Sequence, residues 1–316
     1  MILTLAGGVG GARMCAGLAQ ALPADGLTIV VNTGDDFEHL GLSISPDIDS
    51  VLYTLSGRHD PQRGWGQAGE TWRCMEMLEV LGGQTWFRLG DGDLAMHLWR
   101  TQMLREGLTL SEVTARLSRA LGVRHSVVPM ADIPVRTRVL TEAGELAFQD
   151  YFVRQQCKPR FVGIRWGEKA APASAGLYEA LETSALAGIV ICPSNPFLSI
   201  QPILGLRGVE DALRNRRTPV VAVSPIVGGQ SVKGPLGKML GELGRQASSA
   251  EVASLYRGLI DGIVIDKADA QQVTAIEKLG ICVHVTDTLM PDSAKQYAVA
   301  REALEFTHRL GVNKRP

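Results

Sequence analysis

The sequence predicts an α/β fold: a Rossmann-like, doubly wound and mostly parallel sheet with an inserted subdomain of helices and antiparallel strands. Three observations support this prediction. Six short runs rich in β-branched and aliphatic residues have the composition of buried strands. Segments with apolar residues at helical spacing lie between the runs, and such alternation is typical of parallel sheets. A glycine-rich turn follows the first run and opens a helix, as a strand-to-helix connection does.

The strands that we expect in the central sheet are short and strongly apolar. Five of them are residues 2–6, 27–32, 187–192, 219–224 and 262–266, and a sixth is residues 281–286. The helices expected between and after them are residues 11–22, 209–214, 236–243, 250–260, 268–279 and 293–310. Polar residues are interleaved at helical spacing in the last of these helices, which indicates an amphipathic helix. We expect residues 311–316 to fray.

The middle of the chain has a different pattern. Four segments have helical spacing, namely residues 50–55, 70–81, 93–106 and 111–121. Residues 135–141, 146–154 and 160–165 alternate in the manner of antiparallel strands, and Ala143-Gly144 supplies the turn between the first two. We therefore interpret residues 1–316 as a single α/β domain with an elaboration at about residues 60–175.

Composition limits the classes of protein to which the chain can belong. Its 316 residues are 45% hydrophobic and 21% charged, with a formal net charge of −1. This balance provides no basic surface for nucleic acid, and no apolar run has the roughly 18–20 residues of a membrane span. The run after Met1 is too short for a signal peptide, so we expect a cytoplasmic protein. The five cysteines are far apart and odd in number, and we expect buried free thiols at Cys192 and Cys282.

Four aspartates after the second expected strand form the first candidate site. Asp35, Asp36, Asp47 and Asp49 follow an apolar run that ends at Asn32. Carboxylates outside the carboxyl ends of strands suit a hard cation such as Mg²⁺ in an α/β enzyme. We select Asp35, Asp36 and Asp49 as metal ligands, with Asp35 and Asp49 also as the catalytic residues. Two structural alternatives stay open: Asp49 caps a helix that begins near residue 50, and Asp47 is an ordinary turn residue.

The glycine-rich turn at residues 6–13 is the second candidate site. Gly8, Gly10 and Gly11 allow close approach of the backbone, and amides at the start of a helix favour an anion such as phosphate. Arg13 can add a bidentate contact, and Asn32 is a further expected substrate contact. The turn is not the dinucleotide fingerprint, because Arg13 occupies the position of its third glycine. The alternative is a tight turn with a structural role alone.

The third candidate is Gly-Asp-Gly-Asp at residues 90–93, just before an expected helix. Asp91 or Asp93 would cap that helix, and His97 would share a face with Asp93. A capped surface helix is the alternative to a helix N-terminus placed over a substrate, for which we select Asp91. Trp65 stands between two glycines and is a candidate platform for a flat ring.

Two loops after later strands complete the set. Ser194 and Asn195 lie in a loop that two prolines stiffen, and their short polar side chains suit a base or a phosphate. The loop after the next strand contains Gly228, which permits close backbone approach, and Lys233, which suits a phosphate. Ordinary strand-to-helix loops are the alternative reading of both. In a doubly wound sheet all five segments converge on one edge.

These segments, in this order, resemble the 2-phospho-L-lactate transferase family of coenzyme F(420) biosynthesis. The resemblance covers nearly the whole chain, and the ordered set of motifs is much more specific than any one of them. The matching stretches include Ala-Gly-Gly-Val-Gly-Gly-Ala-Arg at 6–13, Asn-Thr-Gly-Asp-Asp within 30–42, Ser-Pro-Asp-Ile-Asp within 45–55, Asp-Pro-Gln-Arg-Gly-Trp-Gly at 60–66, Trp-Phe-Arg-Leu-Gly-Asp at 86–91, Phe-Gln-Asp-Tyr-Phe-Val-Arg at 148–154, Pro-Ser-Asn-Pro at 193–196 and Ser-Pro-Ile-Val-Gly-Gly at 224–229.

The resemblance implies a reaction that the residues alone do not name. Relatives take a guanylated phospho-acid, in which a diphosphate links guanosine to phospholactate, phosphoenolpyruvate or 3-phosphoglycerate. They transfer its phospho-acid half to the ribityl hydroxyl of 8-hydroxy-5-deazariboflavin (Fo) and release GMP, with Mg²⁺ required. The resemblance also implies a homodimer. Within this reaction the glycine turn would approach the diphosphate, Ser194 and Asn195 would contact the nucleotide, and Trp65 with residues 90–93 would contact the deazaflavin.

The resemblance leaves the donor acid open. Relatives commonly have Gly-Asp-Arg-Asp where this chain has glycine at the third position, Gly92. The number of metal ions is open as well. Two other functions are considered: a nucleotide-binding regulatory protein of the same fold without transfer activity, and a sugar-nucleotide transferase. The retained aspartates argue against the regulatory protein, and binding of the deazaflavin would argue against both.

Overall fold

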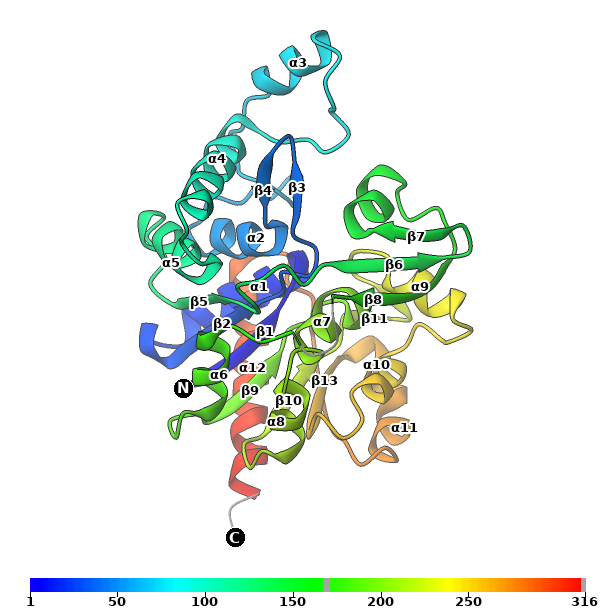
Figure 1. Ribbon diagram of the computed structural model, residues 1–316. Coiled ribbons are helices and arrows are strands. Elements are labelled where there is room, and N and C mark those ends of the chain that lie inside the picture. The colour runs from blue at the N-terminus through cyan, green and yellow to red at the C-terminus, as the bar shows by residue number, and fades with distance from the viewer. Residues whose placement is uncertain (168–170, 314–316) are drawn as a thin grey trace.

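A computed structural model describes residues 1–167 and 171–313 of the chain. Its centre is a seven-stranded sheet in the order β14-β13-β10-β9-β1-β2-β5, and all neighbouring strands are parallel (Figure 1). The predicted α/β fold is therefore confirmed. The strands are β1 (Ile2–Ala6), β2 (Leu27–Val31), β5 (Ser126–Pro129), β9 (Gly188–Ile191), β10 (Val220–Val223), β13 (Gly262–Asp266) and β14 (Cys282–Thr286).

Six of these strands were predicted, and β5 was missed. Its sequence is short and ends in Pro129, which lacks an amide hydrogen for the sheet. Proline is tolerated there because β5 is an edge strand that pairs with β2 alone. Since β5 lies within residues 60–175, the range that we interpreted as an elaboration also supplies a strand to the central sheet.

The strand order reverses in the middle of the sheet. From β1 the chain proceeds outward through β2 to β5, and then returns to β9 on the other side of β1 before it continues outward to β14. In doubly wound sheets the loops on either side of such a reversal leave a crevice at the carboxyl ends of the strands. The loops after β1 and β9 border this point.

Helices cover both faces of the sheet, because successive side chains of each buried strand point to opposite faces. Leu3 and Leu5 of β1 belong to one apolar cluster and Ala6 to the other. The helices that contribute to the Ala6 cluster are α1 (Gly8–Ala21), α2 (Pro46–Leu55), α4 (Asp91–Arg105), α5 (Leu110–Ala120) and α12 (Ser293–Asn313). Those on the other face are α6 (Ala175–Glu182), α7 (Gln201–Leu204), α8 (Val209–Asn215), α9 (Leu236–Glu242), α10 (Ser249–Leu255) and α11 (Val273–Glu277).

The predicted antiparallel strands form a separate small sheet in the order β7-β6-β8. Its strands are β6 (Thr137–Thr141), β7 (Gly144–Ala147) and β8 (Phe161–Trp166). The expected strand 146–154 is wrong beyond residue 147, because the chain turns there into a π-helical segment, Asp150–Arg154. Phe148, just before this segment, and Phe152 within it stack ring on ring, which a strand does not permit for residues four apart.

A hairpin of β3 (Phe37–His39) and β4 (Leu42–Ile44) was also missed, since each strand has three residues. Leu40 and Gly41 at its tip both have positive φ, as a tight hairpin turn requires. In Figure 1 the hairpin rises above the sheet, with α3 (Arg73–Val80) at the top of the molecule. A second small hairpin consists of β11 (Ile226–Val227) and β12 (Gln230–Ser231).

Several expected boundaries differ from the structure. The expected helix 268–279 divides into a 3₁₀ segment, Lys267–Gln272, and α11. α12 continues to Asn313, so the expected fraying at 311 is wrong, and residues 314–316 lie outside the described residues. Cys282 is exposed rather than buried because β14 is the edge strand, whereas Cys192 is buried as predicted. Among the described helices none is long and apolar enough to cross a membrane.

Candidate active site

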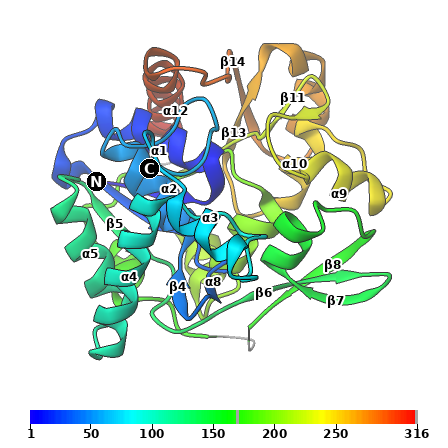
Figure 2. The same ribbon diagram turned by 90° about the horizontal axis from the view of Figure 1, so that it is seen from above.

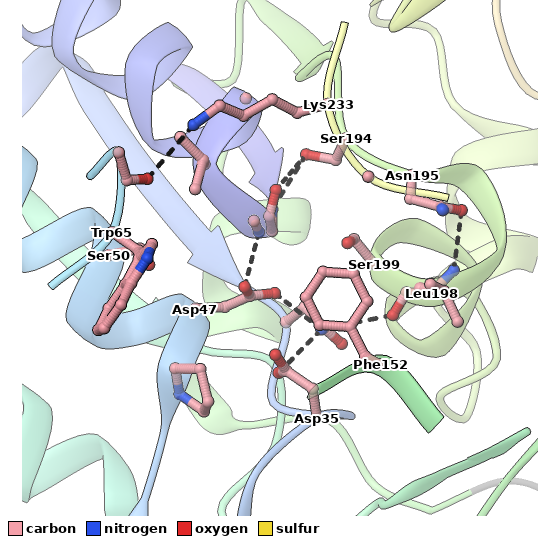
Figure 3. Close-up of a pocket in the computed structure, with 18 of the residues that line it drawn as sticks. Asp35, Asp47, Ser50, Trp65, Phe152, Ser194, Asn195, Leu198, Ser199 and Lys233 are labelled. Carbon is pink, nitrogen blue, oxygen red and sulfur yellow. Dashed lines mark hydrogen bonds between the residues drawn. The ribbon is translucent and has the colours of Figure 1, made fainter. Parts of the chain in front are cut away.

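Seen from above in Figure 2, α4 and α5 lie at the left of the molecule and α9 and α10 at the right. A cavity of about 720 Å³ lies at the carboxyl ends of the central strands, at the reversal of strand order (Figure 3). Every one of the five predicted segments contributes to its wall. The predicted site residues that line it are Gly8, Gly10, Arg13, Asn32, Asp35, Asp49, Trp65, Ser194 and Asn195. The expectation that these segments converge on one sheet edge is confirmed.

The glycine turn packs against the loop after β9. The Ser194 hydroxyl accepts a hydrogen bond from the Gly7 amide at 3.1 Å and donates one to the Gly7 carbonyl at 2.7 Å. A Cβ at Gly10 would lie 2.6 Å from the Pro193 carbonyl oxygen, and one at Gly11 would lie 2.8 Å from the Ser194 hydroxyl. The two loops can approach this closely because glycine has no side chain. Gly11 takes part in this packing and does not line the cavity.

Asp35 and Asp47 share one amide donor. Asn32 Nδ2 donates to Asp47 Oδ2 at 2.9 Å and to Asp35 Oδ1 at 3.3 Å, and the Gly8 amide donates to Asp47 Oδ1 at 2.7 Å. Both carboxylates are buried. Burial and then repulsion by Asp47 and Asp36 raise the pKa of Asp35 well above its usual range, and burial raises the pKa of Asp47 to about 6. Asp47 therefore lies in the first turn of α2 as part of the site, and not as an ordinary turn residue.

Asp49 has a different environment. The fully buried Arg100 of α4 donates to both of its oxygens, from Nη1 to Oδ2 at 3.1 Å and from Nη2 to Oδ1. Arg100 Nη1 also lies 3.0 Å from His97 Nδ1, so the imidazole accepts there, and burial lowers the pKa of His97 to about 4. His97 and Asp93 both line the cavity, which confirms their shared face. The alternative of Asp49 as a helix cap is wrong, because α2 begins at Pro46 and Ser45 is its N-cap.

Besides Gly11, three predicted site residues do not line the cavity. Asp36 accepts a hydrogen bond from the Ser45 hydroxyl at 2.7 Å, so the adjacent aspartates face different ways. Asp91 accepts from the Thr71 hydroxyl and from the Cys74 amide at 3.2 Å. The Gly228 amide donates to Asp269 at 3.1 Å, which holds the loop after β10 in place. These three side chains or amides are thus engaged in contacts with the protein itself.

The expected cap of α4 is also wrong. Its N-cap is Gly90, and neither Asp91 nor Asp93 caps the helix. The carboxylate of Glu70 instead accepts from the amides of Gly92 at 2.7 Å and Asp93 at 2.9 Å. Burial raises the pKa of Asp93, which lines the cavity, to about 6.

Aromatic side chains form an apolar part of the wall. Trp65 is 44% exposed, and in Figure 3 it lies across the cavity from Asn195. Phe148 and Phe152 stack with ring centroids 5.5 Å apart and an interplanar angle of 11°. No role was predicted for these two phenylalanines, although their i, i+4 spacing is the signal that places them on one face of a helical turn. Flat rings pack well on such surfaces.

The two carboxylates of Asp35 and Asp47 suit a hard divalent cation. Asp35 and Asp47 are buried like charges with raised pKa values, and a cation between them would relieve their repulsion. No group of three histidine, cysteine or acidic side chains forms a metal cage among the residues that the structure describes. Mg²⁺ does not need one, because it commonly binds one or two carboxylates together with water and substrate phosphates.

Comparison with known proteins gives consistent matches over almost the whole chain. The family model of the 2-phospho-L-lactate transferase CofD matches residues 2–301. The phosphoenolpyruvate transferase of Streptomyces coelicolor is 40% identical over 98% of this chain and 98% of its own length. The 2-phospho-L-lactate transferase of Methanosarcina mazei is 38% identical over 95% of this chain and 98% of its own length. A crystal structure of a UPF0052 family member from Bacillus halodurans has a TM-score of 0.65 and 16% identity, covers 96% of this chain and 98% of that one, and shows the fold alone.

Proposed function

This chain belongs to the 2-phospho-L-lactate transferase family, and on that premise we propose how it acts as a phospho-acid transferase of coenzyme F(420) biosynthesis. It moves the phospho-acid half of a guanylated phospho-acid onto the ribityl hydroxyl of Fo and releases GMP. The donor is of the phospholactate, phosphoenolpyruvate or 3-phosphoglycerate type. The observation that supports this most strongly is the single cavity wall in which buried aspartates, a helix N-terminus and aromatic rings occur together.

The transferred group requires positioning and charge neutralisation more than a covalent nucleophile. The Gly8 amide is held by Asp47, but the positive end of the α1 dipole and the amides after Gly8 favour the diphosphate next to Gly8 and Gly10. Ser194 orients the glycine turn through its two bonds to Gly7, and Asn195 lines the cavity beside it as a nucleotide contact.

Asp35 and Asp47 are the residues that would hold Mg²⁺. Bound there, Mg²⁺ would neutralise diphosphate charge and so favour departure of GMP. Asp49 remains a predicted ligand, but Arg100 already occupies both of its oxygens, and Asp36 faces Ser45. We therefore give Asp47 the place beside Asp35, and keep Asp35 as the residue that accepts the ribityl proton.

The ribityl alcohol of Fo carries a flat deazaflavin ring, and the aromatic wall suits it. Trp65 and the stacked pair Phe148 and Phe152 offer apolar ring faces to the cavity. The homodimer and the cytoplasmic location that we expected from the sequence stay predictions. A nucleotide-binding regulatory protein without transfer activity is the alternative function.

The test is a reaction of the protein with Fo, Mg²⁺ and each guanylated acid in turn, analysed by mass spectrometry. A phosphodiester of Fo from one donor supports the transferase and identifies its acid. Absence of product with all three donors, from folded protein that still binds guanosine nucleotides, would favour the regulatory protein.

A further inference from the structure

Two basic side chains line the same cavity close to each other. Arg13 comes from α1, and Lys233 comes from the loop between β12 and α9. Burial and then the charge of Arg13 lower the pKa of Lys233, as expected for neighbouring cations. Figure 3 shows the Lys233 side chain extending along the upper part of the cavity.

The backbone around Gly64 positions the Lys233 ammonium group. Lys233 Nζ donates to the Gly64 carbonyl at 3.4 Å, and a Cβ at Gly64 would lie 2.3 Å from that nitrogen. Gly64 also has a φ of +72°, which side chains other than glycine's rarely adopt. The turn that contains Trp65 therefore contacts the ammonium group directly.

Neither cation forms an ion pair with an acidic side chain among the described residues. Arg13 Nε is a buried donor without a hydrogen-bond partner in that part of the chain. Arg100 differs in this respect, because Asp49 neutralises its charge. Two unneutralised cations in a cavity favour an anionic ligand group.

The proposed donor has two kinds of anionic group, the diphosphate and the carboxylate of the acid. The diphosphate suits the start of α1 and a cation held by Asp35 and Asp47, as argued above. A carboxylate has no such partner, and the aspartates repel it. A guanidinium fork matches a carboxylate in geometry, and a lysine beside it adds a second donor.

We propose that Arg13 and Lys233 form the subsite that binds the carboxylate of the donor's phospho-acid and so select acids over other guanosine diphosphate esters. This inference rests on the proposed function. It gives these two residues a role in recognising the carboxylate, the group that all three candidate acids share. The diphosphate and the nucleotide bind elsewhere in the cavity.

Binding measurements with two ligands separate the carboxylate from the diphosphate. The first ligand is the guanosine diphosphate ester of lactate, and the second is the ethyl ester of GDP, which has the same diphosphate and no carboxylate. Isothermal titration calorimetry with Mg²⁺ and without Fo measures both affinities in the absence of turnover. Wild-type protein is expected to bind the lactate ester about tenfold or more tightly than the ethyl ester, as a charge-assisted hydrogen bond would provide.

The variants are Lys233→Met and Arg13→Met, with Lys278→Met, an exposed lysine at the end of α11, as the control for charge loss. Each cavity variant is expected to lose about tenfold in affinity for the lactate ester and less than about twofold for the ethyl ester. Arg13→Lys keeps the charge and should retain part of the preference. Circular dichroism checks that each variant is folded.

Equal losses for both ligands would overturn the carboxylate subsite and make the pair a phosphate contact. Unchanged affinity of both variants for the lactate ester would overturn it too. Equal affinity of the wild-type protein for the two esters removes this inference but leaves transfer possible. A protein that binds neither ester contradicts the proposed function as well, so the two failures are distinguishable.

Discussion

Removal of the Arg100 side chain should destabilise the protein strongly. Arg100 is 0% exposed and donates to both oxygens of Asp49, itself 5% exposed. In Arg100→Met a buried carboxylate would lose its cation while Asp36, Asp47 and Asp93 remain in the same region. Breaking a buried ion pair by removing one partner costs about 3–5 kcal/mol. That is a large fraction of the roughly 5–15 kcal/mol by which proteins are stable.

Chemical denaturation at neutral pH measures this loss. A matched control is Arg165→Met, because Arg165 also contacts both oxygens of a carboxylate, Glu145, but its side chain is 63% exposed. Exposed pairs contribute about 0–1 kcal/mol, so the control should unfold nearly as the wild type does. The double variant Arg100→Met with Asp49→Asn removes both charges and should recover part of the loss.

A loss of stability below about 1 kcal/mol in Arg100→Met would contradict this prediction, since the buried pair would then behave as an exposed one. So would a double variant no more stable than Arg100→Met, because Asp49 would then not be the group left unpaired. The same pair means that Asp49→Asn alone destabilises the fold. Loss of activity in Asp49→Asn is therefore weak evidence for a metal ligand, and Asp35→Asn is the better test.

Three further predictions concern single residues. Gly10→Ala should weaken binding of GDP and lower the melting temperature, because its Cβ would lie 2.6 Å from the Pro193 carbonyl oxygen. The control Gly241→Ala in α9 meets nothing within 4 Å and should not lower the melting temperature, since alanine favours a helix more than glycine does. Thr109→Ala removes the capping box of α5 and should cost about 1 kcal/mol in denaturant unfolding. Burial lowers the pKa of His39 from 6.5, so protonation of this histidine favours the unfolded state. The stability that neutral His39 contributes is therefore lost as pH falls below 6.5. The free energy of unfolding of His39→Asn should depend less on pH in that range than that of the wild type.

Much of the site could be predicted because parallel strands place their carboxyl ends at one edge. The glycine turn, the aspartates and the loop with Ser194 each follow a strand that the apolar pattern identifies, so their convergence needed no knowledge of side-chain packing. The α/β fold followed from the same alternation. These predictions depend on local pattern and on topology alone.

Other features depend on contacts between residues distant in sequence. Arg100 reaches Asp49 across 51 positions, and no spacing rule links an arginine inside a helix to that carboxylate. Glu70 takes the place of the expected cap of α4 from 23 positions before Asp93. The β3 and β4 strands have three residues each, which is too short for a period of two to be recognised. Cys282 was expected to be buried because its neighbours in sequence are apolar, but it is exposed because β14 is an edge strand.

We propose that buried carboxylates at this sheet edge hold Mg²⁺ for transfer of the phospho-acid to Fo. The most direct test is to quantify GMP and the Fo phosphodiester in the same reaction, with and without Mg²⁺, for the wild type, Asp35→Asn and the exposed control Asp211→Asn. We expect GMP and the Fo phosphodiester in equal amounts from the wild type and from the control, and neither product without Mg²⁺ or from folded Asp35→Asn. Undiminished transfer by Asp35→Asn, or in the presence of a chelator, would contradict it.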